Sequence, residues 1–248
     1  MKGIVLAGDS GNRLYPITLG VSKHLIPIYD KPMVYYPIEM LVCAGIREIL
    51  IITTSIHQPF FKSVLGNGSS FGASFSYAIQ NEPKGIADAI RIAKDFIDTD
   101  GVCLITGDTI LTGANLTALI NKAKKAINNS GSATIFVKRD PDENQYGKVV
   151  LDKKGKCEKI VGDSDSHFYS SIVGMYVYPS DASDRVETLS LSERGRYEIT
   201  SLLQQYFADN KLQILQLSNE CIWWDTNSPE SLARLGHYLY TNRNIKHY

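Results

Sequence analysis

The sequence predicts an α/β fold in which helices cover both faces of a mixed, mainly parallel central sheet. Three observations support this fold class. Short β-branched runs alternate with helical patterns through the first half of the 248-residue chain, an order typical of βαβ units. A glycine-rich turn follows the first run, at a point where parallel sheets commonly bind ligands. The second half has shorter strand patterns, which indicate a smaller β-rich part.

In the first half, apolar runs predict strands and amphipathic stretches predict helices. The expected strands are Gly3–Ala7, Glu48–Thr53, Ser74–Ala78 and Val102–Thr106, and the expected helices lie near Met33–Cys43, near Gln58–Leu65 and at Ile86–Phe96. Because strands and helices alternate, the loops beyond the carboxyl ends of the strands are the expected ligand-binding region.

The second half predicts a mixed or antiparallel arrangement with turns near Asp152-Lys153-Lys154-Gly155. Its expected strands are Ser132–Val137, Lys148–Leu151, Cys157–Val161, Ile172–Tyr178 and Gln213–Leu217, and its expected helices are Leu116–Ile127, Ile199–Ala208 and Pro229–Tyr240. Ser228 is an expected N-cap with Pro229 at the first helical position. No linker or repeat separates the halves, so we expect a single domain.

Composition excludes several classes of protein. Lys and Arg number 26, as do Asp and Glu, so the net charge of zero favours neither nucleic acid nor a membrane surface as a partner. The four cysteines form no C-x-x-C pair, which argues against zinc and disulfides and fits a reduced cytoplasm. The apolar stretch Met33–Thr54 is too interrupted to span a bilayer, and the amino terminus does not resemble a signal peptide.

The segment Leu6–Leu14 has the composition of a phosphate-binding turn. Gly8 and Gly11 would let backbone N–H groups approach phosphate oxygens, and Arg13 could neutralise their charge. The segment matches neither G-x-x-x-x-G-K-[ST] nor G-x-G-x-x-G, which excludes the usual P-loop and dinucleotide-binding interpretations. A turn of this kind is also common as a purely structural feature.

Further motifs follow this turn in order, namely Pro16-Ile17-Thr18 and then Ser22-Lys23-His24-Leu25-Ile26-Pro27. Together they resemble the signature of sugar-1-phosphate nucleotidyltransferases, G-G-x-G-T-R-L-x-P-x-T followed by x-x-K-x-x-x-P, and most of all the glucose-1-phosphate thymidylyltransferases. The resemblance runs from Met1 to about His237. It includes Gly107-Asp108-Thr109, Arg194-Gly195-Arg196-Tyr197-Glu198-Ile199-Thr200 and Trp224-Asp225-Thr226.

The resemblance implies a Rossmann-like nucleotidyltransferase fold. It implies a single domain over residues 1–248, with a nucleotide-binding half at about 1–130 and a sugar-phosphate-binding half at about 131–248. The implied activity transfers thymidylyl from dTTP to a hexose 1-phosphate such as glucose 1-phosphate, releases pyrophosphate and serves nucleotide-sugar and polysaccharide biosynthesis. The implied cofactor is Mg²⁺, and the implied state is a cytoplasmic homo-oligomer without the C-terminal helical tail of longer relatives.

The resemblance also assigns roles to individual residues. The implied catalytic residues are Arg13, Lys23 and Asp108. The implied nucleotide-binding residues are Leu6, Gly8, Asp9, Ser10, Gly11, Asn12, Gln80 and Gly85, with Gln80 suited to thymine or uracil. The implied sugar-phosphate residues are Tyr146, Gly147, Glu158, Lys159, Gly174 and Tyr176. Asp108 closes the expected strand Val102–Thr106, and Asp225 follows Ile222-Trp223-Trp224 near the end of the sequence. This carboxylate pair is the implied Mg²⁺ site.

Several positions depart from the family pattern. Asp9 replaces the second glycine of the phosphate turn and adds a negative charge, Ile160 replaces a proline after Lys159, and Asn227-Ser228 replaces a glycine-threonine pair. Two alternatives therefore stay open. The chain uses another nucleotide or sugar phosphate, or it is a catalytically impaired relative that binds such ligands in a regulatory role.

Overall fold

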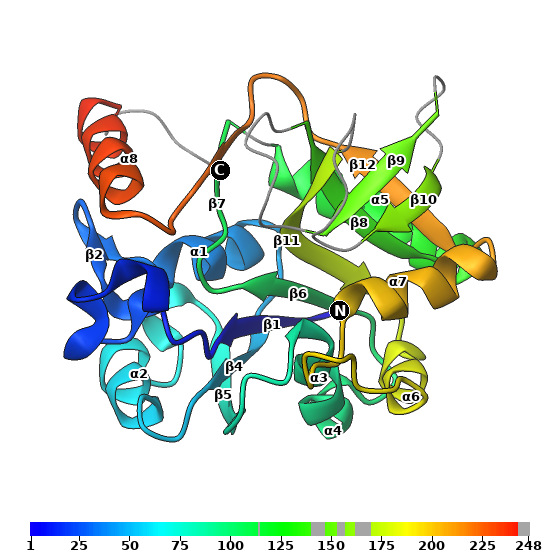
Figure 1. Cartoon of the computed structure of the whole chain (residues 1–248), viewed down its shortest axis with the longest axis horizontal. Helices are drawn as coiled ribbons and strands as arrows, with labels where there is room; N and C mark the ends of the chain where they lie inside the picture. The colour runs from blue at the N-terminus through cyan, green and yellow to red at the C-terminus, as the bar shows by residue number, and fades with distance from the viewer. Residues whose placement is uncertain (114, 140–146, 153–156, 162–169, 243–248) are drawn as a thin grey trace.

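The computed structural model describes residues 1–113, 115–139, 147–152, 157–161 and 170–242. Within these residues, nine strands form one central sheet. They are β1 (Lys2–Ala7), β4 (Glu48–Thr53), β5 (Ser74–Ile79), β6 (Val102–Thr106), β8 (Ala133–Lys138), β9 (Lys148–Leu151), β10 (Cys157–Val161), β11 (Ser170–Tyr178) and β12 (Leu212–Gln216). The order is β10-β9-β11-β6-β1-β4-β5, and β8 pairs with β11 and β12 (Figure 1).

The first half of the sheet is parallel, as the alternation of strands and helices predicts. β1 lies between β4 and β6 and is parallel to both, and β5 is parallel to β4. The core positions Ile4 and Val5 of β1 are fully buried and belong to hydrophobic clusters on opposite faces of the sheet. Burial on both faces explains why these strands are continuously apolar.

The second half of the sheet is antiparallel at its centre. β11 is antiparallel to β6, β8 and β9, and β10 is antiparallel to β9, whereas β12 is parallel to β8. The pairing of β6 with β11 joins the two halves of the chain in one sheet. The expected mixed sheet is therefore confirmed. The turn expected at Asp152-Lys153-Lys154-Gly155 lies largely outside the described residues.

Helices cover both faces of this sheet (Figure 1). One face carries α1 (Tyr35–Cys43), α2 (Gln58–Leu65) and α5 (Leu116–Ser130), whose buried side chains pack in one core cluster. The other carries α3 (Ile86–Ile92), α4 (Lys94–Ile97), α6 (Ala182–Glu187) and α7 (Ile199–Ala208), which form a second cluster. The sheet is thus the middle layer of three.

A third, smaller core holds the C-terminal helix α8 (Pro229–Thr241). The side chain of Ser228 accepts a hydrogen bond from the Ser231 N–H, and Pro229 is the first helical residue, so the expected cap is confirmed. Leu235 and Leu239 pack with Leu14 and with residues around the short pair β2 (Pro27–Ile28) and β3 (Lys31–Pro32). This core therefore holds α8 beside the segment that follows β1.

Several details differ from the expected elements, and α6 and the short pair β2–β3 were not predicted from the sequence. The helix expected at Ile86–Phe96 is divided into α3 and α4, because Ala93 has a ψ of 7° and caps the first piece. A second short sheet, β7 (Ile110–Thr112) paired with β13 (Ile222–Trp224), has no counterpart in the sequence prediction. Strands of three residues are too short to show a period. None of the described helices is long and apolar enough to cross a membrane.

Candidate active site

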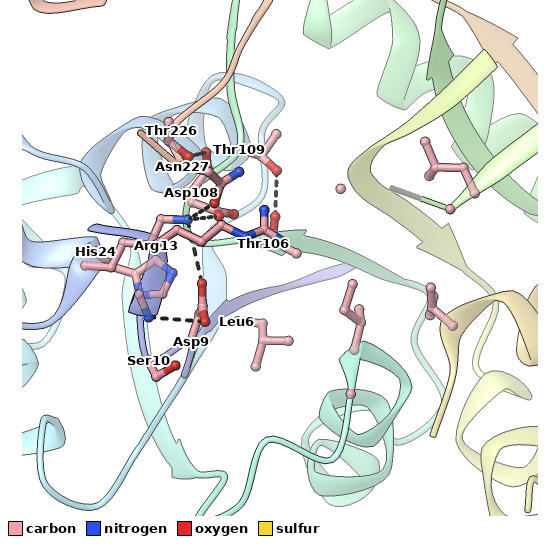
Figure 2. A pocket seen from close by; sticks show the side chains of 18 of the residues that line it. Leu6, Asp9, Ser10, Arg13, His24, Thr106, Asp108, Thr109, Thr226 and Asn227 are labelled. Atoms are coloured by element: carbon pink, nitrogen blue, oxygen red, sulfur yellow. Dashed lines mark hydrogen bonds and ion pairs between the residues drawn. The ribbon is translucent and has the colours of Figure 1, made fainter. Parts of the chain in front are cut away.

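A cavity of about 510 Å³ lies beyond the carboxyl ends of β1 and β6. These strands are adjacent, with Leu6 paired to Thr106, and the Gly107 N–H donates to the Leu6 carbonyl at 2.8 Å. The glycine turn after β1 and Asp108 after β6 consequently line the same cavity (Figure 2). Ligand-binding sites of α/β proteins commonly occupy this position beyond the carboxyl ends of the strands.

The glycine turn needs its glycine at position 11. Gly11 has a φ of +66°, and a Cβ there would lie 2.8 Å from Thr18 Cγ2 and 2.9 Å from Lys23 Cβ. The Thr18 hydroxyl donates to the Gly11 carbonyl at 3.1 Å, and Asp9 Oδ1 accepts from the Gly11 N–H at 3.3 Å. The turn is thus packed directly against the segment that carries Lys23.

Lys23 is the centre of a polar cluster inside the cavity. Its ammonium lies 2.5 Å from Asp108 Oδ2, 2.9 Å from Asn227 Oδ1 and 3.7 Å from Asp9 Oδ2. Only 1% of Lys23 is exposed. Figure 2 shows Asp9 and Asp108 reaching this cluster from different parts of the chain, with Asn227 beside Asp108. A buried ammonium therefore holds together segments from both ends of the chain.

Burial and the Lys23 charge together set the protonation states of Asp108 and His24. Burial by itself raises the pKa of Asp108, but the adjacent Lys23 ammonium outweighs it and holds that pKa well below its usual range. Burial lowers the pKa of His24 to about 4, against the opposing effect of Asp108. Its Nδ1 has no hydrogen-bond partner among the described residues. Near neutral pH, Asp108 is thus a carboxylate and His24 is uncharged.

Two segments of the cavity lining, the start of α3 and the Arg194–Glu198 segment, meet at Gly85. Gly85 has a φ of +97°, and a Cβ there would lie 2.4 Å from the Tyr197 carbonyl oxygen. The Tyr197 N–H donates to the Lys84 carbonyl at 2.7 Å. The Arg194–Glu198 segment is thereby held against the start of α3. Arg194 and Arg196 from this segment line the cavity, and Arg194 also contacts Glu198 at 3.2 Å.

Another part of the cavity lining comes from β11, which bends beside the cavity. Gly174 has a φ of +71°, and a Cβ there would lie 2.5 Å from Thr109 Oγ1 and 2.7 Å from Thr106 Oγ1. The pairing of β11 with β8 changes register between Ile172 and Tyr176. Such an irregularity redirects side chains next to a site. Here it brings Gly174 and Tyr176 to the cavity.

Most of the residues singled out from the sequence line this one cavity. They are Leu6, Asp9, Ser10, Gly11, Asn12, Arg13, Lys23, Gly85, Asp108, Gly147, Gly174 and Tyr176. Gly8 and Gln80 are not among the lining residues, but they lie next to each other, since a Cβ on Gly8 would be 3.4 Å from Gln80 Oε1. Tyr146 lies outside the described residues.

Three further expected site residues, besides Gly8 and Gln80, lie outside the lining. Glu158 and Lys159 are exposed on β10, the edge strand of the sheet, and do not line this cavity. Asp225 directly follows β13, but its Oδ1 accepts from Asn227 and its Oδ2 from Ser231 Oγ at 2.9 Å. Its neighbours Thr226 and Asn227 reach the cavity in its place. The proposed roles of these three residues stay predictions.

The sequence interpretation did not assign roles to several lining residues, namely His24, Arg194, Arg196, Trp223, Trp224 and Asn227. The two arginines belonged to a motif already noted, and paired arginines before a helix are a usable signal for phosphate binding. Asn227 offered no such signal, because only the tertiary structure shows that it contacts Lys23.

Comparison with known proteins identifies the family. The family model described as nucleotidyl transferase matches residues 2–241. This chain belongs to the nucleotidyl transferase family. The glucose-1-phosphate thymidylyltransferase of Neisseria meningitidis is 40% identical over 99% of this chain and 85% of its own length. That of Mycolicibacterium smegmatis is 41% identical over 97% of this chain and 83% of its own length.

A solved structure supports the same conclusion for this nucleotidyl transferase. A Bacillus anthracis protein, provisionally assigned as a glucose-1-phosphate thymidylyltransferase and crystallised with sucrose, superimposes with a TM-score of 0.89. The alignment has 31% identity and covers 99% of this chain and 96% of the other. The expected Rossmann-like nucleotidyltransferase fold is therefore confirmed. Enzymes of this family take nucleoside triphosphates and sugar phosphates and generally need a divalent metal.

Proposed function

We propose that this nucleotidyl transferase moves a thymidylyl group from dTTP to glucose 1-phosphate and releases pyrophosphate. The observation that carries the proposal is the convergence of the glycine turn, Arg13, Lys23 and Asp108 at the carboxyl ends of two adjacent parallel strands. The relatives named as glucose-1-phosphate thymidylyltransferases support the choice of nucleotide and sugar.

We assign a part of the reaction to each group of lining residues. The N–H groups of the glycine turn and the cations of Arg13 and Lys23 bind the triphosphate. A phosphate oxygen of the sugar phosphate attacks the α-phosphorus in line, and the bond to the bridging oxygen breaks as pyrophosphate departs with the electron pair. Arg13 and Lys23 neutralise the charge that develops on this leaving group. The enzyme thus acts mainly by positioning the two substrates and stabilising the charge of the transition state.

The part of the lining that holds the two arginines is suited to the sugar phosphate. Arg194 and Arg196 line the cavity beside Gly147, Gly174 and Tyr176. A guanidinium group binds a phosphate dianion through two parallel hydrogen bonds. The aromatic ring of Tyr176 offers an amphipathic surface to a sugar ring. We propose that this wall holds glucose 1-phosphate and that Lys159 contributes only if its strand moves toward the cavity.

We propose Asp108 and Asp225 as the carboxylates that would hold Mg²⁺. The antiparallel pair β7–β13 brings Asp108 and Asp225 to the same end of a short sheet, and Thr226 Oγ1 donates to the Asp108 carbonyl at 3.2 Å. No cluster of three or more His, Cys, Asp or Glu side chains capable of binding a metal occurs in the described part of the chain. Mg²⁺ is commonly held by one or two carboxylates together with substrate phosphates. Bound there, it would offset the negative charge of the triphosphate.

The remaining proposals concern organisation. We propose that residues 1–248 form one domain with a nucleotide-binding half at about 1–130 and a sugar-phosphate-binding half at about 131–248. The continuous sheet that joins β6 to β11 supports a single domain. Assembly as a homo-oligomer and a cytoplasmic location stay predictions from the family resemblance.

The decisive experiment measures pyrophosphate release. Purified protein is incubated with Mg²⁺, glucose 1-phosphate and, in turn, dTTP, UTP, CTP, GTP or ATP. Preferential release with dTTP supports the proposal, whereas preference for another nucleotide replaces the proposed donor. The matched controls are Lys23→Met, which we expect to be inactive, and Lys31→Met, which lies outside the cavity lining.

One observation favours a second candidate, a binding protein with impaired catalysis. Asp9 Oδ2 lies 3.7 Å from the Lys23 ammonium, so a second carboxylate besides Asp108 faces the cation that we propose binds the triphosphate. If none of the five nucleotides gives pyrophosphate release but nucleotide binding is measurable by calorimetry, the result would support this binding protein over the enzyme.

A further inference from the structure

The side-chain amide of Gln80 is fixed in one orientation by its surroundings. Gln80 is 6% exposed and follows β5, and its Nε2 donates to Asp88 Oδ2 at 2.8 Å and to the Gly85 carbonyl at 3.2 Å. Both partners are acceptors, so only the NH₂ end of the amide can face them. The two N–H donors of Gln80 are then fully used, and Oε1 must point the other way.

Asp88 is itself held in place by Arg91. Asp88 is 2% exposed, and its Oδ1 accepts from Arg91 Nε at 2.9 Å and from a terminal nitrogen of Arg91 at 2.7 Å. Its other oxygen is committed to Gln80. The carboxylate therefore connects a fixed guanidinium to the amide and leaves neither group free to rotate.

Gln80 Oε1 is directed toward the glycine turn. A Cβ on Gly8 would lie 3.4 Å from Oε1, and no other atom of the described residues beyond the chain neighbours of Gly8 lies within 4 Å of that position. No hydrogen bond to Oε1 occurs within the described part of the chain. The Gln80 carbonyl oxygen therefore faces the glycine turn without a hydrogen-bond partner in the described residues, and it is the atom of Gln80 left for a ligand bound beside that turn.

We propose that Asp88 is a positioning residue that determines which base the enzyme accepts. This inference rests on the proposed function, because it takes the Gln80 side as the base-binding side. By presenting an acceptor, Gln80 selects a base edge with a ring N–H donor, as thymine and uracil have at N3. Cytosine presents a lone pair at N3, so two acceptors would face each other and leave a buried group unpaired.

The Asp88→Asn variant tests this with a change that should invert the amide. Arg91 donates only, so it takes the carbonyl oxygen of the new asparagine and leaves its NH₂ facing Gln80. Gln80 then turns its own oxygen toward position 88 and its NH₂ toward the ligand. This rotation gives up the hydrogen bond from Gln80 to the Gly85 carbonyl. The preference for UTP over CTP should fall about 10- to 100-fold, the effect of leaving one buried polar group unpaired.

The measurement is the dissociation constant of UTP, dTTP and CTP by titration calorimetry, for the parent protein, Asp88→Asn and Asp184→Asn. Asp184 provides a matched control, since it is an exposed carboxylate that pairs with Lys94 at 3.0 Å on the surface. This control should keep the parent's ratio. An Asp88→Asn protein that folds and keeps the parent's ratio overturns the proposal.

The parent alone supplies a test that no folding defect can obscure. UTP should bind at least tenfold more tightly than CTP, and dTTP methylated at N3 should bind as weakly as CTP. Equal binding of UTP and CTP by the parent, or binding of no nucleotide, overturns the inference. Nucleotide binding with this selectivity but without pyrophosphate release would instead count against the proposed function alone.

Discussion

Replacing Lys23 by methionine tests the centre of the site. The substitution keeps the length and much of the volume of a side chain that is 1% exposed, but it removes the ammonium that contacts Asp108, Asn227 and Asp9. Removing one partner of a buried ion pair costs roughly 3–5 kcal/mol of unfolding free energy. Because the Asp108 side chain stays 23% exposed and can recover some hydration, we expect the lower end, about 3 kcal/mol.

That loss is measurable as a change in melting temperature. For a chain of this length, 1 kcal/mol corresponds to roughly 2–4 °C, so Lys23→Met should melt about 6–12 °C below the parent. Turnover should fall by roughly 10²- to 10³-fold, the usual cost of removing one group that stabilises developing charge. Calorimetric melting and pyrophosphate release give the two quantities.

Lys31→Met is the matched control. Its ammonium also lies 2.5 Å from a carboxylate, Glu39, but the two side chains are 26% and 31% exposed and outside the cavity lining. We expect a loss of less than about 1 kcal/mol and unchanged turnover. If Lys23→Met matches this control in both stability and activity, Lys23 has neither the structural nor the catalytic role assigned to it.

Three further predictions follow from other parts of the site. Asp9→Asn keeps an acceptor for the Gly11 N–H but removes a charge near Lys23, so the KM for the nucleotide should fall roughly tenfold; an unchanged KM in a steady-state assay would show that Asp9 does not oppose the triphosphate. Gly85→Ala should cost about 2–3 kcal/mol in urea denaturation, because its φ is +97° and Tyr197 blocks a Cβ, whereas Gly20→Ala, with no atom within 4 Å, should be tolerated. EDTA should abolish turnover and added Mg²⁺ restore it without a change in melting temperature, since the proposed carboxylate pair needs substrate phosphates to complete the site; a destabilised apoprotein would indicate a structural metal instead.

Most regular elements were predictable because their signals are local. β4, α2, β6, β9, β10 and α7 have the bounds expected from the sequence. The helix break at Ala93 was not predictable, because the residues on both sides of it favour a helix. The pairing of β7 with β13 joins segments more than a hundred residues apart, and strands this short show no period of their own.

The candidate site likewise combines residues that local motifs revealed with contacts that only the fold reveals. The glycine turn, Arg13 and Lys23 lie close together in the sequence, so their motif and spacing revealed them. The neighbours of Lys23 are distant in sequence, since Asp108 is 85 residues away and Asn227 is 204. Lys159 illustrates the opposite case, because a motif placed it in the site while the fold places it on an edge strand.

The sequence by itself determined the fold class, the family resemblance and most of the residues around the cavity, because burial patterns and short motifs are properties of neighbouring residues. Only the tertiary structure decided which charges meet, that Asn227 takes the position beside Lys23, and that Asp88 fixes the orientation of Gln80. Hydrogen bonds and ion pairs depend on angstrom-scale distances between segments, and packing of the whole chain sets those distances.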